Sequence, residues 1–587
     1  MKIDVVRPVK LRARTNDSRF VDVFRRIVGN DWNSIVKSWE FPISSTDDLL
    51  NELVRSGLVS IEKTEEMRKT IEDTADYRGI NVDDVLKEVK IPLRPYQIKT
   101  LQFFKHRGSA LGALPVALGK TLVSLTYIRS LLKNGEIKKA LVLCPRAVRW
   151  HWVREVEKFF GDKMTAVVVG QEIKTDGSSR NRQRKERLKI WNSPYDIYIA
   201  NYEQLRDLYN IETLPAIGKG RPRKVIRANP ETAKLWDGNE NNSFIVIADE
   251  VTKIKTQGAQ RTRLLKSVPA KFRIGLSGRP LENRLDELYT IIDWIWPGSL
   301  GSYTSFKTKH IIEDEYQRPM RYVDVEDLKK KLKWVTIYFS KAEVLPDLPS
   351  LIRSELQIDL SDEELEEYGR IREEAIKSIK EIENATNPSS KGRQVLSMLA
   401  WVTIARMYVD HPLLVSESNS DSAKAVNVKC KTSSKMNALM EYLEEVEGQK
   451  VVIFSQYRRM IDILEKEIAE RFPITRTYKL VGGMKNPQEP IDAFKKDPVG
   501  GIFLSTDAGA YGIELQCAHI MIHYEEHYNP AVMDQREGRI HRPGLTEAAN
   551  AVNLICTDQQ VIERRVREVL DRKNLLYADV MGGLHES

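Results

Sequence analysis

Two stretches of this chain alternate short apolar runs with amphipathic helical patterns, and this alternation limits the possible folds more than any other feature. The first stretch spans residues 90–300 and the second begins after residue 440. The apolar runs are ALVLC at 140–144, DIYIAN at 196–201, FIVIAD at 244–249, FRIGLSG at 272–278, KVVIFS at 450–455, GIFLST at 501–506, HIMIHY at 519–524 and AVNLIC at 551–556. Strands that alternate with helices form parallel sheets. The sequence therefore predicts an α/β protein with two lobes.

The composition excludes several classes of protein. The chain has 587 residues, of which 41% are hydrophobic and 30% charged, which is enough to bury real cores and too apolar for global disorder. Its apolar runs are strand-sized, far short of the ~20 residues that cross a bilayer, and MKIDVVRPVK lacks the apolar core of a signal peptide. We expect an intracellular, soluble protein without a membrane partner, cytoplasmic in a prokaryotic or virus-infected cell and nuclear in a eukaryote.

Cysteine spacing and net charge limit the kinds of metal and macromolecule that the protein is expected to bind. The four cysteines lie far apart with no CxxC pair, so we expect neither a zinc site nor a disulfide framework. The net charge of +9 fits a polyanionic partner without proving one. A basic segment at 219–227 contains Lys219, Arg221, Arg223, Lys224 and Arg227 with no acid. It is interpreted equally well as a solvated loop or as a phosphate contact.

The sequence ALGKT at 117–121 has the form of the end of a P-loop. Gly119, Lys120 and Thr121 precede an amphipathic helix, where backbone amides attract phosphate, the lysine reaches the β- and γ-phosphates and the hydroxyl can ligate Mg²⁺. The complete GxxxxGK[ST] pattern fails, because Leu114 stands where the first glycine belongs. Taken alone, the tripeptide is also compatible with an ordinary helix start.

The run FIVIADE ends an apolar strand in Asp249 and Glu250. An acid at the carboxyl end of a strand can hold Mg²⁺, and its neighbour can orient or deprotonate the attacking water. A strand that simply ends in two surface acids is the alternative. The nearby P-loop pattern favours a Walker B pair.

The segment QREGRIHRPG at 535–544 places Arg539 and Arg542 three residues apart. On one helical turn the two side chains project together, and we expect them to enter a cleft between the lobes. The fixed charge and planar fork of arginine suit it to stabilising a transferring γ-phosphoryl group.

These motifs resemble those of Swi/Snf-type superfamily 2 ATPases, the double-stranded DNA translocases, over residues 93 to about 570. The resemblance implies two RecA-like parallel-sheet lobes with helical insertions, plus a small N-terminal α+β module. The segments that carry it are LRPYQ at 93–97, ALGKT at 117–121, LVLCPRAVRWHWVREVEKF at 141–159, NYEQL at 201–205, DEVTKIK at 249–255, LSGRPLENRLDELY at 276–289, HPLLV at 411–415, SSKM at 433–436, VVIFSQYRRMIDIL at 451–464, STDAGAYGIELQCA at 505–518 and QREGRIHRPG at 535–544.

The resemblance also implies the domain boundaries. The expected parts are a DNA-binding module at 1–60, a helical connector at 61–89, lobe 1 with the ATP site at 90–300, helical insertions and an inter-lobe linker at 301–435, lobe 2 at 436–560 and a C-terminal helix at 561–587.

By the same resemblance, ATP and Mg²⁺ are the expected cofactors, and the site residues follow position by position. Gln97 contacts adenine, Thr121 and Asp249 hold the metal, and Glu250 positions water. The catalytic set is Lys120, Glu250, Arg539 and Arg542, and the further nucleotide contacts are Leu118, Gly119, Thr121, Gly512 and Gln535. The expected DNA contacts are Arg146, Trp152, Asn201, Tyr202, Ser277, Ser455, Gln456, Ser505 and Thr506.

The chain departs from the family pattern in three places. Where the family has DEMGLGKT, this chain has LPVALGKT, so Leu114, Pro115 and Ala117 replace two acids and a glycine. A loop that needs the conformational freedom of glycine would be altered or strained there. The acidic motif is DEVT rather than DEAH, which removes the histidine that couples γ-phosphate sensing to the next motif. Tyr338 and Phe339 replace an Arg-Arg pair. The rate and coupling of hydrolysis are therefore open.

The N-terminal segment 17–53 resembles a HARP module of the kind found in annealing helicases. Residues 1–40 hold nine lysines or arginines against five acids. Trp32 and Trp39 would stack on unpaired bases while Arg19 holds phosphate. Aromatics that fill a small local core are an equally weighted interpretation.

We therefore expect a monomeric, ATP-dependent translocase on double-stranded or branched DNA that remodels or reanneals forks. Two alternatives remain open. One is a strand-separating superfamily 2 helicase acting on DNA or RNA, and the other is a nucleotide-binding DNA scaffold with weak hydrolysis.

Overall fold

The computed structural model describes all of the chain except a set of short segments. These are residues 1, 7–9, 16, 28–29, 34–36, 43–44, 171–179, 215–222, 233–234, 236–243, 316–318, 384–387, 485, 508–511, 559–560 and 585–587. The chain forms two compact units, one of residues 1–344 with 576–587 and the other of residues 345–575. The predicted part 301–435 is therefore divided between them, because the chain passes into the second unit at Leu345.

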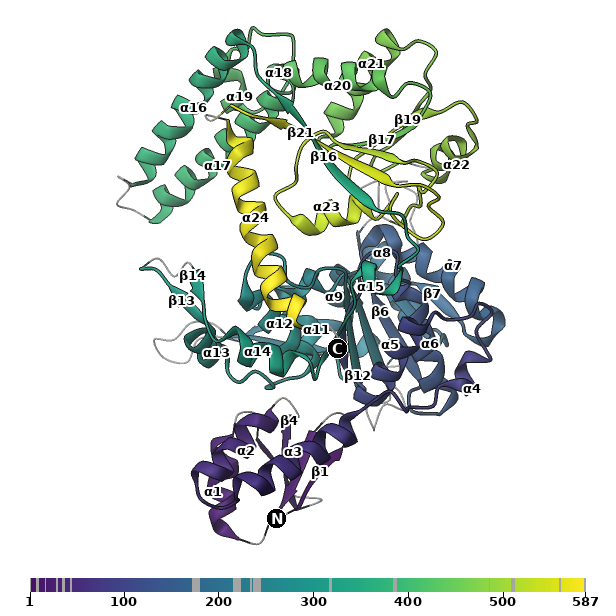
Figure 1. The fold of residues 1–587 in the computed structure, drawn as a ribbon, viewed down its shortest axis with the longest axis vertical. Helices are drawn as coiled ribbons and strands as arrows, with labels where there is room; N and C mark the ends of the chain where they lie inside the picture. Colours follow the sequence, from purple (N-terminus) through teal and green to yellow (C-terminus); the bar gives the residue numbers. More distant parts are fainter. Residues whose placement is uncertain are drawn as a thin grey trace. The chain divides into compact units, whose positions relative to one another are not determined.

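The N-terminal module is a four-stranded antiparallel sheet, in the order β1-β2-β4-β3, packed with three helices (Figure 1). Its elements are β1 (Lys2–Val6), β2 (Lys10–Arg14), α1 (Ser18–Arg26), β3 (Asp31–Asn33), β4 (Ser38–Pro42), α2 (Thr46–Arg55) and α3 (Ile61–Ala75). Leu11, Phe24, Phe41 and Leu49 are buried and form its core. This is the α+β module that the sequence predicts. Helix α3 packs on α2 and β1, so the first half of the predicted connector belongs to this module.

Lobe 1 is built on a seven-stranded, wholly parallel sheet in the order β15-β5-β12-β11-β6-β8-β7. Its strands are β5 (Ala110–Ala113), β6 (Lys139–Leu143), β7 (Ala166–Val168), β8 (Ile197–Ala200), β11 (Phe244–Asp249), β12 (Phe272–Ser277) and β15 (Thr336–Tyr338). Its main helices are α5 (Pro95–Arg107), α6 (Lys120–Lys133), α7 (Arg149–Phe160), α8 (Arg180–Trp191), α11 (Gln260–Lys266) and α12 (Leu285–Ile295). The four predicted strands of this lobe are confirmed.

Smaller elements complete the first unit. They are α4 (Asp83–Leu86), α9 (Leu205–Leu208), the hairpin β9 (Tyr209–Leu214) and β10 (Arg223–Ala228), α13 (Tyr303–His310), the hairpin β13 (Ile311–Glu313) and β14 (Pro319–Tyr322), α14 (Val325–Leu332) and α15 (Lys341–Val344). Strand β15 follows α14 and pairs with β5, so the segment after residue 300 returns to the lobe 1 sheet rather than forming a linker.

Lobe 2 is built on a second parallel sheet, six strands in the order β16-β21-β20-β17-β19-β18. Its strands are β16 (Leu351–Ile358), β17 (Lys450–Phe454), β18 (Thr477–Leu480), β19 (Gly501–Ser505), β20 (Ile520–His523) and β21 (Ala549–Cys556). Its helices are α16 (Asp362–Glu383), α17 (Pro388–Asp410), α18 (Pro412–Ser416), α19 (Asp421–Val426), α20 (Ser434–Glu445), α21 (Arg458–Arg471), α22 (Gln488–Lys496), α23 (Pro530–Glu537) and α24 (Ile562–Met581). The two predicted RecA-like parallel sheets are thus confirmed.

Strand β17 shows why these strands are continuously apolar. Val451 and Ile453 lie in one buried cluster, whereas Val452 and Phe454 lie in another. Neighbouring residues of a strand point to opposite faces of the sheet. Because both faces are buried, every position of the strand favours an apolar side chain.

A fully buried lysine joins three segments of the lobe 2 core. Lys435 at the start of α20 lies 2.9 Å from Asp410 at the end of α17, and it also pairs with Glu563 at the start of α24. Burial disfavours the ammonium, but the two carboxylates raise the pKa of Lys435 above its ordinary value. The charged lysine is therefore part of the fold of this lobe.

Substituting Lys435 with methionine should destabilise lobe 2 strongly. The variant leaves two carboxylates in a buried site without their cation, and such a loss costs about 3–5 kcal/mol in the free energy of unfolding. Urea unfolding followed by circular dichroism measures the change. Lys466→Met, at an exposed lysine of α21, is the control and should change stability by less than about 0.5 kcal/mol. Equal effects of the two substitutions would contradict the assignment.

Within the described residues, no helix is both long and apolar enough to cross a membrane. The same residues contain no group of three or more histidine, cysteine, aspartate or glutamate side chains arranged to hold a metal ion.

Candidate functional site

The loop between β5 and α6 has the geometry of a phosphate-binding loop. Gly119 adopts the left-handed conformation, with φ of +75°, and helix α6 begins at Lys120. The Lys120 Nζ donates to the carbonyl oxygen of Leu114 at 3.0 Å, so the lysine folds back over the loop. Gly119, Lys120 and Thr121 remain partly accessible. The first amides of α6 are therefore available to a phosphate.

Gln97 lies directly against this loop. Its Oε1 accepts from the Arg94 amide at 2.9 Å, and its Nε2 donates to the Leu118 carbonyl oxygen at 3.2 Å. A Cβ on Gly119 would lie 2.4 Å from the Gln97 Nε2, so a side chain here would displace the Gln97 amide, and the positive φ also favours glycine. The structure thus brings Gln97, Leu118 and Gly119 together. Their contacts with adenine and phosphate remain predictions.

Ala117 confirms that the altered loop is strained. Its φ is +74°, in the region that glycine adopts readily and that an L-residue with a Cβ disfavours. This is the position where the family pattern has glycine and this chain does not. The alanine at this position therefore holds an unfavourable backbone conformation.

Asp249 ends β11 and Glu250 follows it, at the carboxyl edge of the same sheet. Burial raises the pKa of Asp249, while the charge of Lys120 and two hydrogen bonds, from the Trp152 indole and the Glu250 amide, oppose that rise. Glu250 has a φ of +50°, which turns the chain sharply at the end of the strand. A threonine hydroxyl and a carboxylate are the oxygen donors that Mg²⁺ prefers. Thr121 and Asp249 therefore fit the predicted metal in their chemistry.

Two predicted DNA contacts are in fact supports for Asp249. The Trp152 indole on α7 is only 1% exposed, and its Nε1 donates to the Asp249 Oδ2 at 3.0 Å. Tyr202 is also buried, and its Oη donates to the Asp249 carbonyl oxygen at 2.8 Å. Because neither ring reaches the surface in this structure, the prediction that they contact DNA does not fit. Both instead fix the acidic strand end.

Four predicted hydroxyl contacts are buried as well. The Ser277 Oγ accepts from the Arg279 amide, and the Ser455 Oγ accepts from the Tyr457 amide. The Ser505 Oγ donates to the Leu480 carbonyl oxygen. Thr506 is buried beside it. These hydroxyls shape loops of the two lobes and do not offer a surface for DNA in this structure.

The exposed side of the α7 region presents a different set of residues. Arg146, a predicted DNA contact, is exposed, and so are Trp150, at 43%, and Arg154. The exposed tryptophan of this helix is thus Trp150, not the predicted Trp152. The WHW pattern contained the signal, because residues two apart on a helix point in nearly opposite directions, so only one of the two tryptophans can face the core. Asn201 and Gln456, the other predicted contacts, are half-buried.

In lobe 2 the two predicted arginines converge on one carbonyl group. The Nη1 atoms of Arg539 and Arg542 donate to the Ile513 carbonyl oxygen at 3.5 and 3.3 Å. Gly512, just before it, has a φ of +75°, and Gln535 is half-buried on α23. The two guanidinium groups therefore lie close together, and their entry into a cleft between the lobes stays a prediction. The expected helical turn is not observed, because α23 ends at Glu537 and both arginines lie beyond its end.

Arg536 is a third arginine of this segment that the sequence analysis missed. Its buried guanidinium forms two hydrogen bonds with the Asp507 carboxylate, at 2.6 and 3.0 Å. It also donates to the Glu525 carbonyl oxygen at 3.2 Å. The three-residue spacing of Arg536, Arg539 and Arg542 was the available signal. Arg536 ties the end of α23 to the segment that follows β19.

The N-terminal aromatics divide between the two interpretations. Trp32 is 49% exposed. Trp39 is half-buried, and its ring lies 6.3 Å from the core residue Phe24 and 5.5 Å from Trp32. Arg19 is exposed and paired with Asp17. Trp32 is thus available for stacking, whereas Trp39 belongs partly to the local core.

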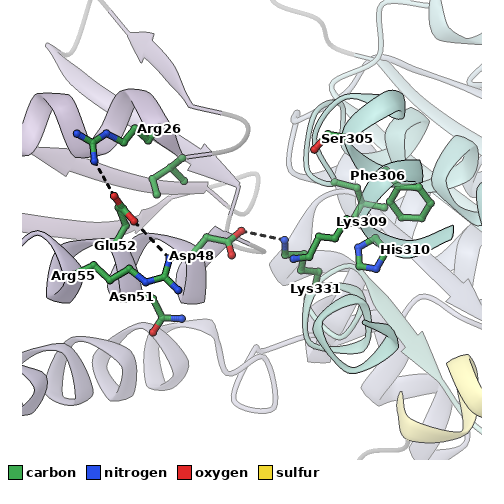
Figure 2. A pocket seen from close by; sticks show the side chains of 12 residues that line it. Arg26, Asp48, Asn51, Glu52, Arg55, Ser305, Phe306, Lys309, His310 and Lys331 are labelled. Atoms are coloured by element: carbon green, nitrogen blue, oxygen red, sulfur yellow. Dashed lines mark hydrogen bonds and ion pairs between the residues drawn. The ribbon is translucent and has the colours of Figure 1, made fainter. Parts of the chain in front are cut away.

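A groove of about 330 Å³ lies between the N-terminal module and helices α13 and α14 of lobe 1 (Figure 2). Glu52 pairs with Arg26 at 3.0 Å and lies 3.9 Å from Arg55, and Asp48 pairs with Lys331 at 3.0 Å. Lys309 and Lys331 are also paired with acids of α14 and the residue before it. Carboxylates thus balance the cations named here, and the ion pair between Asp48 and Lys331 links the module to lobe 1.

The predicted basic segment can be followed only in part. Lys219 and Arg221 lie outside the described residues. Arg223 and Lys224 begin β10, and Arg227 of the same strand pairs with Glu212 of β9 at 3.3 Å. The charge of Arg227 is therefore balanced by a neighbouring strand.

Replacing Trp152 with phenylalanine should weaken the apparent affinity for Mg²⁺. The substitution keeps the ring in the core but removes the N–H that holds Asp249, and loss of such a supporting hydrogen bond typically lowers metal affinity about 10- to 100-fold. Titrating ATPase activity with Mg²⁺ measures the shift. Trp191→Phe is the matched control, since Trp191 is equally buried and its Nε1 has no hydrogen-bond partner. A shift of the same size in the control would contradict the role given to Trp152.

Replacing Ala117 with glycine should stabilise lobe 1. The left-handed conformation costs an L-residue about 1–2 kcal/mol, and glycine removes this cost. The greater conformational freedom of glycine in the unfolded chain lowers the free energy of unfolding by about 0.4–1 kcal/mol and so offsets part of the stabilisation. The free energy of unfolding should therefore rise by about 0.5–1 kcal/mol. Chemical denaturation of the two proteins measures it. Destabilisation by the glycine would show that the strain at Ala117 is absent.

Comparisons with known proteins agree with this site. The SNF2-related domain family matches residues 96–413, and the helicase conserved C-terminal domain matches residues 434–544. Residues 1–95 lie outside both matches.

Individual relatives are distant. YwqA of Bacillus subtilis is 24% identical over 541 residues, covering 90% of this chain and 53% of its own length. The DNA repair and recombination protein RDH54 of Saccharomyces cerevisiae is 24% identical over 501 residues, covering 77% of this chain and 49% of its own length. This chain thus spans about half the length of these curated relatives.

Among solved structures, the Sulfolobus solfataricus SWI2/SNF2 ATPase core in complex with double-stranded DNA is 26% identical, with a TM-score of 0.36 over 84% of this chain and 94% of that chain. The family match itself extends over more than half of the chain and includes the P-loop, Asp249 and Glu250. The chain therefore belongs to the SNF2-related family of helicase-like ATPases.

Proposed function

We propose that this protein hydrolyses ATP and uses the energy to translocate along double-stranded DNA. The observation that carries the proposal is the arrangement at one edge of the lobe 1 sheet. There the P-loop residues Lys120 and Thr121 and the acids Asp249 and Glu250 follow strands of the same parallel sheet. The positive charge of Lys120 opposes the rise that burial causes in the pKa of Asp249.

Each residue of this edge has a role in the proposal. The amides that begin α6 and the Lys120 ammonium bind the β- and γ-phosphates. Thr121 and Asp249 hold Mg²⁺, which neutralises charge on the phosphates when it is bound. Glu250 orients the attacking water, and Gln97 contacts adenine from its position beside Leu118. Trp152 and Tyr202 keep Asp249 in place.

Lobe 2 contributes arginines in the proposal. Arg539 and Arg542 already point to a common oxygen, that of Ile513, and a γ-phosphate oxygen would replace this acceptor during the cycle. Arginine charge at that point stabilises the transferring phosphoryl group. Arg536 supports the segment through Asp507 and does not itself contact nucleotide.

Duplex DNA is the proposed polymer. Arg146, Trp150 and Arg154 form an exposed basic and aromatic surface on lobe 1, and contacts of this kind to the backbone give little base specificity and strong salt dependence. The relative RDH54 is by its name a DNA repair and recombination protein. The N-terminal module, with Trp32 exposed, would add recognition of unpaired bases at forks or branches, as the resemblance to HARP modules implies.

A nucleotide-binding scaffold is the second candidate, and one observation favours it. The strained Ala117 replaces a glycine in the loop that must hold the phosphates. A loop that cannot adjust around the γ-phosphate would bind ATP and hydrolyse it slowly. Both candidates use the same residues for binding, so turnover separates them.

Steady-state ATPase assays test the proposed function. Turnover should be low without nucleic acid and should rise at least tenfold with blunt duplex or a model fork, and less with single-stranded DNA or duplex RNA. Lys120→Ala and Glu250→Gln should each lower the stimulated rate by at least about 100-fold, because the first removes the phosphate contact and the second the group that orients water. The ratio of fork to duplex stimulation reports on the N-terminal module.

Other results would favour the competing candidates. Turnover that both substitutions leave unchanged would overturn the motor and indicate a scaffold. Separation of the strands of a partial duplex would indicate a helicase, whereas displacement of a third strand from a triplex without strand separation would support translocation.

A further inference from the structure

The loop of residues 278–284, which joins β12 to α12, lies between two parts of the proposed ATP site in lobe 1, the acidic pair Asp249–Glu250 and the P-loop. Strands β11 and β12 are parallel neighbours, and Asp249 is opposite Leu276 in their register. The loop therefore begins beside the acidic pair, at the same edge of the sheet. Its conformation bears directly on the position of Asp249 and Glu250.

The other side of this loop touches the P-loop. A Cβ on Gly278 would lie 3.5 Å from the Val116 amide nitrogen and 3.6 Å from the Leu114 carbonyl oxygen. That carbonyl oxygen is the one to which the Lys120 Nζ donates. The 278–284 loop is thus packed against residues 114–116 of the P-loop, which include the carbonyl group that accepts the hydrogen bond from Lys120.

One lysine anchors the loop to the segment that follows the acidic pair. Lys255 comes at the end of the short helix Val251–Ile254, and its Nζ lies 2.6 Å from the Glu282 Oε2 and 3.3 Å from the Glu287 Oε1. Glu287 in turn accepts from the Asn283 amide at 3.1 Å and from its side chain at 3.2 Å. Lys255 therefore holds the loop both directly and through Glu287.

The charged groups of this ion-pair cluster are mostly buried. The side chains of Lys255, Glu282 and Glu287 are 24%, 11% and 14% exposed, so none of the charges is fully hydrated. Burial opposes the ammonium, yet the two carboxylates still raise the pKa of Lys255. A charge so placed is costly without its partner, and the pair resists displacement of the loop.

Val251 and Thr252, which lie nearer to Glu250, connect this segment to the sheet by packing. Val251 is fully buried, and its side chain packs against the backbone at Gly275, while Thr252 is buried beside it. The ion pair between Lys255 and Glu282 adds a charged link from the same segment to the loop.

We propose that Lys255 and Glu282 are a positioning pair, which fixes the 278–284 loop between the acidic strand end and the P-loop and thereby sets the rate of ATP hydrolysis. The inference rests on the proposed ATPase. The pair does not itself contact the nucleotide in this proposal. It acts through the loop, on the relative positions of Glu250 and Lys120.

Kinetics of Lys255→Met and Glu282→Gln test the pair. Each should lower kcat about 10- to 100-fold, because a small misplacement of catalytic groups has an effect of this size, while the KM for ATP changes less than threefold. The double variant should be no slower than Lys255→Met alone, since both changes break one interaction. Lys255→Arg keeps the charge and should retain at least half of kcat.

A second ion pair of the same lobe is the matched control. Lys266 of α11 pairs with Asp293 of α12, with side chains 29% and 22% exposed, at the far end of the helix that follows the loop. Lys266→Met should lower the thermal unfolding midpoint about as much as Lys255→Met and leave kcat within twofold of the wild type. Equal loss of kcat in both variants would mean that the Lys255 pair is merely structural and would overturn the inference.

Hydrogen exchange of the full chain separates failure of this inference from failure of the proposed function. Amides of residues 278–284 and 114–118 should exchange at least fivefold faster in Lys255→Met than in the wild type or in Lys266→Met. If the wild type lacks ATPase activity, the proposed function is lost, and the positioning role is judged by this exchange alone. If the wild type is active and Lys255→Met matches it in kcat or in exchange, the positioning role is overturned.

Discussion

Backbone hydrogen bonds between the parallel strands β5, β12 and β11 hold three functional loops at one edge of the lobe 1 sheet. The carboxyl ends of parallel strands all point the same way, so the P-loop, the 278–284 loop and the acidic pair are neighbours although more than 150 residues separate the first from the last part of this edge. Every polar contact of the candidate site depends on that register. A shift of one residue along any of these strands would move each of its side chains to the opposite face of the sheet.

In both lobes, buried side chains fix the positions of charged groups. Trp152 and Tyr202 donate hydrogen bonds to the carboxylate and the backbone carbonyl of Asp249, and Arg536 is held by the Asp507 carboxylate in lobe 2. Lys435 does the same for two acids in the core of that lobe. In each case a charge that would be unfavourable alone is retained because its partner is held by packing. Precise geometry and local stability are therefore linked in both lobes.

Hydrophobic periodicity and motif spacing were sufficient to predict most of the strands of both sheets. All eight apolar runs predicted as strands are strands, because a strand buried on both faces must be continuously apolar and so stands out in the sequence. The strands that were missed, such as β5 and β15, are short or mixed in composition and owe their place to pairing with neighbours. The same limit explains the tryptophans. The sequence shows two aromatic residues at 150 and 152, but only the packing of α7 on lobe 1 decides that Trp152 is inside.

The sequence by itself determined the class of fold, the family and the candidate phosphate-binding and acidic residues, because these follow from local patterns whose chemistry allows few alternatives. Only the tertiary structure decided which predicted residues are accessible, that Ser277, Ser455 and Ser505 are buried, and that Arg536 is paired with Asp507. It also showed that Ala117 retains the backbone conformation of a glycine. Burial and partner choice depend on contacts between segments far apart in the chain, and local spacing does not contain that information.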